Sequence, residues 1–519
     1  MTDERRAGEL TLTEMLRWAW RQLTSMRTAL ILLLLLALAA IPGSVIPQRD
    51  VDSLKTARWQ DAHPDLTPIY DRLGLFSVYD SPWFSAVYIL LMVSLVGCFV
   101  PRTFVYWKAL RAAPPPAPRN LARLPDHASY DAPGTPDEAL GAAHAELKRR
   151  GFRVVTGEGD TVSAERGKLR EAGNLLFHVS VLVVLVGFAV GSLFGYRGGV
   201  ILVVGNGFSN NLTQYDDFVP GSLFGADDME PFSFDVTDFD VDWLTEGPSR
   251  GQARGFVSHL EYRETPSAEP KDYDLKVNHP LTIGDTEVFL IGHGYAPVVT
   301  VRDGNGDVAY SGPTIFLPTD QTFRSFGVVK APDARPTQIG LEGEFYPTYA
   351  FTEESGPFSA FGQAANPAIS MLVYAGDLGM DSGQPQSVYQ LDKARAELVR
   401  KQDGSMFRVD LAPGQRVQLP DELGSVSFDG IQRWNKIQIS RTPGKLVALA
   451  GVVLALIGLL GSLFIRPRRI WVRAQQRDGR TFVEVAGLDR SGGGDLAEEL
   501  REIVRALETG QTNSGEQRA

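Results

Sequence analysis

The chain has few side chains that can ligate a metal or act as a nucleophile: it contains seven histidines and a single cysteine. His178 differs from the other histidines because it lies within LLFHVSVLVVLVG, an apolar run without a charged residue. An ionisable ring in lipid is costly unless it has a partner, so an intramembrane histidine is a candidate functional residue. Its neutral imidazole could be an axial ligand of haem iron. The alternative is a hydrogen bond to a carbonyl or serine of a neighbouring helix.

A haem iron that is ligated on both faces needs a second donor. The sequence has no other histidine within an apolar segment, so a second histidine ligand would come from another subunit. Cys98 lies in a different apolar segment and could bind or react. The alternative for Cys98 is a packing role, because free cysteine commonly behaves as a small buried apolar residue.

The remaining histidines lack a partner at ligand spacing. His279 belongs to an Asn-His-Pro turn in KVNHPLTIGDTEVFLIGHGYAP and is a secondary candidate, with a structural role in the turn as the alternative. His259 and His293 lie in SHLEY and IGHGY, and His127 and His144 fit exposed positions of a small polar segment. No Ser-His-Asp order, P-loop, HExxH or dinucleotide-binding fingerprint is present. One cysteine also excludes a disulfide, a CxxC pair and a CxxCH haem-attachment site.

Four apolar segments must position these residues. They cover residues 28–46, 83–100, 173–195 and 445–465. Inside them there is no Asp, Glu, Lys or Arg, except Lys445 at the first position of the fourth. At about 1.5 Å per residue, each is long enough to cross a hydrocarbon core of roughly 30 Å. The sequence therefore predicts four transmembrane helices.

A cluster of basic residues lies at one end of each segment, and all four clusters fall on the same side of the membrane if the N-terminus is cytoplasmic. The basic residues are Arg17, Arg21, Arg27, Arg102, Lys108, Arg111, Arg166, Lys168, Arg170, Arg466, Arg468, Arg469 and Arg473. The positive-inside rule then predicts that segments 1–27, 101–172 and 466–519 are cytoplasmic and that 47–82 and 196–444 lie outside. Cleavage of the first segment as a signal peptide is an alternative, because ALAA resembles a cleavage stretch.

The two larger polar segments differ in the secondary structure that their residue patterns predict. Residues 124–170 predict a small cytoplasmic α+β unit after a Pro-rich linker, with a strand at ASYDAP, a helix at PDEALGAAHAELKRRG and a hairpin around GEGD. Segment 196–444 has short β-branched and aromatic runs between Gly, Asp and Pro turns, which predicts an antiparallel β-sandwich or barrel. Within it, LDKARAELVRKQ is the clearest expected helix.

Charge follows the same division. Residues 198–443 carry 34 acidic and 18 basic side chains, a net charge of 18 − 34 = −16, whereas the whole chain carries −11. This acidity argues against nucleic-acid binding. The predicted fold class is a membrane protein with four transmembrane α-helices, a large extracytoplasmic antiparallel β-rich domain and a small cytoplasmic α+β unit.

Five blocks in this order give the chain a resemblance to the ResB/CcsB family of the System II cytochrome c biogenesis pathway. They are GSVIPQ at 43–48, DRLGLFSVYDSPWF at 71–84, GNLLFHVSVLVVLVG at 173–187, VNHPL at 277–281 and RTPGKLVALAGVVLALIGLLGSLFIRPRRIWV at 441–472. The similarity includes the intramembrane histidine of the third span, which matches His178, and extends over nearly the whole chain.

The resemblance implies a bacterial cytoplasmic-membrane protein that helps to move haem b from the cytoplasmic side to the outer face. It implies a ResC/CcsA-type partner with a Trp-rich haem site, and apocytochrome c as the acceptor of the haem. This chain lacks a Trp-rich haem motif, so attachment chemistry is expected of the holocytochrome c synthase complex and not of this chain alone. It also lacks a dithiol, so separate thioredoxin-like helpers would keep the apocytochrome thiols reduced.

Two other classes of protein compete with this reading. One is a membrane-anchored sensor or scaffold whose extracytoplasmic β domain binds a ligand while His178 only packs. The other is an enzyme with an external active site, for which the sequence offers no nucleophile or metal cluster.

Overall fold

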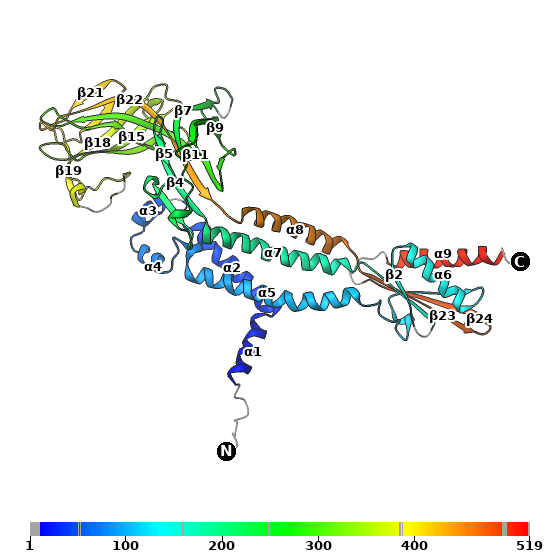
Figure 1. Ribbon diagram of the computed structural model, residues 1–519. Helices are drawn as coiled ribbons and strands as arrows, with labels where there is room; N and C mark the ends of the chain where they lie inside the picture. The colour runs from blue at the N-terminus through cyan, green and yellow to red at the C-terminus, as the bar shows by residue number, and fades with distance from the viewer. Residues whose placement is uncertain are drawn as a thin grey trace, which may run out of the picture. The chain divides into compact units, whose positions relative to one another are not determined.

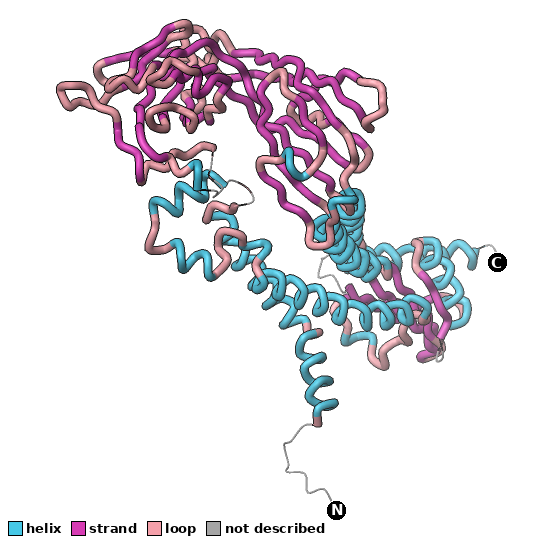
Figure 2. The backbone as a smooth tube through the Cα atoms, turned by 60° about the vertical axis from the view of Figure 1, so that its left-hand side comes forward, coloured by secondary structure: helices cyan, strands magenta, loops and turns pink. Residues whose placement is uncertain are grey.

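The computed structural model describes residues 11–49, 51, 53–157, 160–247, 250–382, 386, 388–489 and 496–516. The chain divides into two compact units. One comprises residues 1–189 and 444–519 and contains most of the helices; the other, residues 190–443, is built mainly of strands (Figures 1 and 2). The helices are α1 Leu12–Leu23, α2 Met26–Val45, α3 Ser53–Ala62, α4 Thr67–Arg72, α5 Pro82–Arg111, α6 Pro136–Arg149, α7 Leu169–Phe194, α8 Lys445–Phe464 and α9 Leu496–Glu516.

Four of these helices, α2, α5, α7 and α8, are long and apolar enough to cross a membrane. Their leucine and valine side chains are largely exposed in the isolated chain, as expected of surfaces that face lipid. Two of them extend past the predicted spans. Helix α5 continues through Pro101 to Arg111, and α7 begins at Leu169, four residues before the predicted span.

Helices α7 and α8 pack closely through small residues. The buried positions are Ser180 and Gly187 on α7 and Ala448, Gly451 and Gly458 on α8. A Cβ atom added to Gly458 would lie 2.5 Å from the backbone nitrogen of a residue in α7. Small residues let two apolar helices approach until their backbones touch, which is the usual packing of helices in lipid. One face of α7 is therefore occupied by its packing against α8.

A five-stranded antiparallel sheet completes the helical unit. Its order is β1-β24-β23-β3-β2, formed by β1 Asp126–Ala132, β2 Arg153–Gly157, β3 Thr161–Arg166, β23 Arg468–Arg477 and β24 Arg480–Asp489. Helices α6 and α9 bury their apolar faces against it. The predicted strand and helix of residues 124–170 are confirmed, and β2 pairs with β3 as the predicted hairpin requires. Residues 158 and 159 of the predicted turn lie outside the described residues. The segment after the last span, whose structure the sequence did not predict, supplies the two central strands β23 and β24 and helix α9.

The strand-rich unit contains two long paired strands, β11 Thr286–Arg302 and β22 Ser425–Arg441. Together with shorter strands they form a seven-stranded sheet, in which bulges interrupt the β11–β22 register near Gly292 and between Val298 and Val299. The other strands of this sheet are β4 Tyr196–Val203, β6 Asp217–Pro220, β10 Leu281–Ile283, β12 Val308–Pro313 and β21 Gln415–Gln418.

Two further sheets pack on different halves of the long strands, each with its own apolar core. One has four strands, β5 Gly207–Ser209, β7 Ser233–Trp243, β8 Ala253–Arg263 and β9 Lys271–Lys276. The other has six, β13 Leu317–Pro318, β14 Ser325–Ala331, β15 Ile339–Tyr346, β18 Ala368–Asp377, β19 Arg395–Leu398 and β20 Arg408–Leu411. A small hairpin joins β16 Tyr349–Thr352 to β17 Gly356–Ser359.

These sheets confirm the predicted antiparallel β-rich domain and correct one detail of it. The expected helix at LDKARAELVRKQ is wrong, because Arg395–Leu398 forms strand β19. This strand pairs with Tyr374–Asp377 of β18. Sheet pairing has overridden the helical propensity of the Lys, Arg, Ala and Glu residues.

Candidate functional site

His178 lies on α7, nine residues after the helix begins, in an apolar stretch of the helix. Its Nδ1 is 2.8 Å from the carbonyl oxygen of Asn174, one turn earlier. A carbonyl can only accept, so Nδ1 carries the proton and donates it, and the lone pair of the neutral ring is on Nε2. Among the described residues no hydrogen bond to Nε2 is recorded. A backbone carbonyl that fixes the tautomer in this way is the usual support of a metal-binding imidazole.

The position of His178 around the helix separates it from α8. The residues of α7 that approach α8 include Gly173, Phe177, Ser180 and Gly187, which lie on one face. His178 follows Phe177 by one residue, a rotation of about 100° along an α-helix of about 3.6 residues per turn. The imidazole of His178 therefore points away from the face of α7 that contacts α8 through small residues.

The side of α7 that carries His178 is linked to α5 by tyrosines of α5. The hydroxyl of Tyr88 donates to the carbonyl of Leu185 at 2.9 Å. The hydroxyl of Tyr106 donates to the carbonyl of Lys168, just before α7 begins, at 3.2 Å. Leu185 follows His178 by seven residues, about two helical turns, and so shares its side of the helix. His178 thus faces α5, between the two tyrosine contacts.

Cys98 lies elsewhere on α5. Its Sγ is 2.8 Å from the carbonyl oxygen of Thr24, just before α2, and donates to it. The hydroxyl of Ser94, one turn earlier on α5, donates in the same way to the carbonyl of Leu23. A Cβ at Gly97 would overlap the Thr24 side chain. This face of α5 packs on the α1–α2 junction, and Cys98 contributes a hydrogen bond to that packing.

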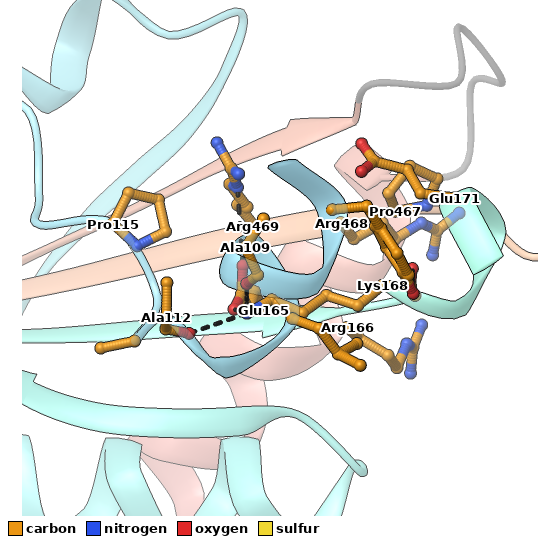
Figure 3. Close-up of a pocket in the computed structure, with 14 residues that line it drawn as sticks. Ala109, Ala112, Pro115, Glu165, Arg166, Lys168, Glu171, Pro467, Arg468 and Arg469 are labelled. Atoms are coloured by element: carbon orange, nitrogen blue, oxygen red, sulfur yellow. Dashed lines mark hydrogen bonds and ion pairs between the residues drawn. The ribbon is translucent and has the colours of Figure 1, made fainter. Parts of the chain in front are cut away.

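A pocket of about 250 Å³ lies where the helices meet the small sheet (Figure 3). It is formed by the end of α5, the junction of β3 with α7 and the junction of α8 with β23. The Lys168 ammonium donates to the carbonyls of Ala109 and Ala112 at 3.1 and 2.9 Å, which neutralises the carbonyl end of α5. It also pairs with the buried carboxylate of Glu165, which lies 3.9 Å from the guanidinium of Arg469.

The histidines of the strand-rich unit are separated from one another. His279 is exposed in the turn between β9 and β10, where its backbone N–H donates to the carbonyl of Lys276. The ring nitrogens of His259 contact carboxylates of Asp274 and Asp240 at 2.8 and 3.1 Å. Burial opposes the charged ring of His259, but these two carboxylates raise its pKa. Within the described part of the chain, no three His, Cys, Asp or Glu side chains are placed to hold a metal.

His293 is the histidine that the sequence did not single out and that the structure buries. It lies on β11 opposite Asn435 of β22, and its ring is stacked on Phe323 with centroids 4.7 Å apart. The residue is 6% exposed, and its Nδ1 has no hydrogen-bond partner in the described part of the chain. Burial, together with the nearby Arg433, lowers the pKa of His293 to about 4. The ring is therefore neutral at pH 7.

Acid should destabilise the strand-rich unit through His293. In the unfolded chain the pKa of His293 is about 6.5. Between pH 6.5 and 4 the ring is therefore protonated in the unfolded state but neutral in the folded state. At pH 5 this costs about 2 kcal/mol of unfolding free energy. We expect His293→Phe to lose less stability than the wild type between pH 7 and 5, measured by thermal unfolding of the detergent-solubilised protein. His279→Gln, an exposed control, should keep the wild-type slope, and equal slopes for all three proteins would contradict this account.

Comparison with known proteins identifies a family for this chain. The model of the ResB-like family matches residues 26–501. The chain is 29% identical over 391 residues to "Cytochrome c biogenesis protein CcsB" of Synechococcus sp. (strain WH7803), covering 74% of this chain and 83% of that protein. It is 27% identical over 405 residues to the protein of the same name from Prochlorococcus marinus (strain MIT 9313), covering 76% and 85%.

A third relative, of the same name, comes from Synechococcus sp. (strain JA-2-3B'a(2-13)). It is 27% identical over 348 residues, covering 62% of this chain and 69% of the relative. The family match includes all four apolar helices, the strand-rich unit and the strands of the small sheet that follow α8. This membrane protein belongs to the ResB-like family.

Proposed function

We propose that the chain acts in cytochrome c biogenesis as a haem-handling membrane subunit. It would receive haem b near the cytoplasmic surface and present it, with a partner, on the outer face for attachment to apocytochrome c. Relatives that carry the name "Cytochrome c biogenesis protein CcsB" over most of their length support the pathway. The observation that carries the haem assignment is the geometry of His178.

His178 fits the requirements of an axial haem ligand. Its Nδ1–H is held by the carbonyl of Asn174, which leaves the Nε2 lone pair for iron. The ring emerges from an apolar helix without a charged neighbour on the adjoining turn, an environment that suits a porphyrin. The second ligand of the iron would come from the partner, because this chain has no other histidine on the four apolar helices.

The membrane orientation is part of the proposal. Basic residues cluster at the start of α2, the end of α5, the start of α7 and the end of α8. The positive-inside rule puts these ends, both termini and the small sheet in the cytoplasm of a bacterium and the strand-rich unit outside. His178 is nine residues, or about 14 Å along the helix axis, from the beginning of α7. Haem would then enter from the cytoplasmic leaflet.

The partner would be a ResC/CcsA-type multi-span protein, with separate thioredoxin-like proteins reducing the apocytochrome thiols. The test is co-expression of this chain with its ResC/CcsA-type partner in a host whose own cytochrome c pathway is deleted. A red complex with a Soret band and matured cytochrome c are expected, and both should be lost when this chain is omitted. A colourless complex, with cytochrome c maturing equally well without this chain, would instead favour a sensor or scaffold.

A further inference from the structure

Two tyrosines, Tyr88 and Tyr106, identify the surface of α5 that faces α7. Tyr88 and Tyr106 are 106 − 88 = 18 residues apart, which is five turns of an α-helix at about 3.6 residues per turn. They therefore point in the same direction, and both contact α7 or the residue before it. Residues of α5 that are three, four or seven positions from them share this face. The face includes, in order, Tyr88, Met92, Leu95, Phe99, Arg102 and Tyr106.

The same contacts set the level of His178 on α5. His178 precedes Leu185 by seven residues, and Leu95 follows Tyr88 by seven in the antiparallel helix, so His178 is level with Leu95. The contact of Tyr106 with Lys168 gives the same level to within one residue. His178 is ten positions from Lys168, and Leu95 is eleven positions from Tyr106. The imidazole is thus opposite an apolar stretch of α5.

Arg102 is the cation on this face of α5. It lies seven residues beyond Leu95, so it is displaced from the level of His178 by about 10 Å along the helix, toward the small sheet. Its side chain is exposed, and the described part of the chain offers it no recorded ion pair or hydrogen bond. The neighbouring cations are engaged: Lys168 caps α5 and pairs with Glu165, and Arg166 and Arg468 pair with Glu499.

We infer that Arg102 binds the propionate carboxylates of the haem that His178 ligates, an inference that rests on the proposed function. A porphyrin held through its iron carries both propionates on one edge, and the apolar remainder fits against Leu95 and Phe99. An unpaired guanidinium at the membrane boundary matches a carboxylate in charge and in bidentate geometry. Arg102 would therefore orient the haem with its propionates toward the cytoplasmic side, while the iron stays deeper in the lipid.

The test measures haem retention in the full chain purified with its ResC/CcsA-type partner. Arg102→Gln should release haem b to an excess of apomyoglobin about tenfold faster than the wild type, because one charge-assisted contact is lost. The Soret maximum should not move, since the ligands of iron are unchanged. Lys108→Gln is the matched control, because Lys108 is two residues past Tyr106 and so lies on another face of α5. It should behave as the wild type.

Two further arms identify the group that Arg102 recognises. Haem dimethyl ester, in which both propionates are neutral, should leave the wild type as fast as haem b leaves Arg102→Gln, and Arg102→Gln should have no added effect on the ester. Arg102→Lys, which keeps the charge, should retain haem better than Arg102→Gln and so shows that the site is intact. Persistence of the Arg102→Gln effect with the ester would overturn the inference.

The outcomes separate this inference from the proposed function. If Arg102→Gln, Lys108→Gln and the wild type release haem equally while His178→Ala loses it, Arg102 is not the propionate ligand but the role of His178 stands. If His178→Ala retains haem with an unchanged spectrum, the proposed function itself fails.

Discussion

Replacing His178 by glycine should reduce the haem that co-purifies with the complex at least tenfold and bring cytochrome c maturation close to background. The physical reason is that, in the proposed function, the Nε2 lone pair of His178 is the donor to iron, and the Asn174 carbonyl fixes the tautomer that leaves this lone pair free. The haem-to-protein ratio and the Soret band of the purified complex measure the first effect. Haem-stained cytochrome c in membranes measures the second.

Added imidazole should restore part of both signals in His178→Gly, because the free ligand can occupy the space left by the ring. The matched control is Leu182→Gly, which removes a side chain of similar size one turn away on the same helix. That variant should keep its haem, and imidazole should leave it unchanged. Haem of normal amount and spectrum in His178→Gly would rule out axial ligation.

Removing Glu499 should destabilise the small sheet by about 3–5 kcal/mol, the usual cost of leaving a buried charge without its partner. Glu499 of α9 accepts from the guanidiniums of Arg468 on β23 and Arg166 on β3. The side chains of Arg468 and Glu499 are 9% and 12% exposed. Glu499→Ala would leave the Arg468 charge with the longer contact to Asp489, at 3.5 Å.

Thermal unfolding and limited proteolysis of the purified protein would measure this loss. We expect cleavage after α8 in Glu499→Ala under conditions that leave the wild type intact. Glu498→Ala is the control, because Glu498 is exposed on the same turn of α9 and its removal should change stability by less than about 0.5 kcal/mol. Equal resistance of the two variants would show that the buried ion pairs contribute little.

The membrane helices could be predicted from sequence because their signal is local. An uninterrupted apolar run of about 20 residues has few alternatives to a spanning helix. The ends of α5 and α7 were less predictable, since polar residues such as Arg102 and Arg170 continue a helix beyond the apolar run without adding to the hydropathy signal. The strand-rich texture of residues 196–444 was equally visible, but its strand order depends on pairings such as β11 with β22 that no local pattern encodes.

The sequence did not reveal that the C-terminal segment contributes to the small sheet, because this contribution also depends on strand pairings that no local pattern encodes. Trp471 of β23 pairs with Ser163 of β3, and Val485 of β24 pairs with Ala128 of β1, so the partners are more than 300 residues apart in the sequence. At the candidate site, the type and setting of His178 identified it from sequence. Its direction toward α5, and hence the relation to Arg102, required the tyrosine contacts at both ends of α7.

The strand order β1-β24-β23-β3-β2 also bears on how the chain is made. On the ribosome, β1, β2 and β3 emerge before α7, the strand-rich unit and α8, whereas β23 and β24 emerge after all of them. The edge of β3 and the edge of β1 therefore stay open throughout the synthesis and insertion of the intervening residues. This sheet can therefore form only after translation has passed the last membrane helix. A nascent chain that stalls earlier exposes unpaired strand edges to chaperones and proteases.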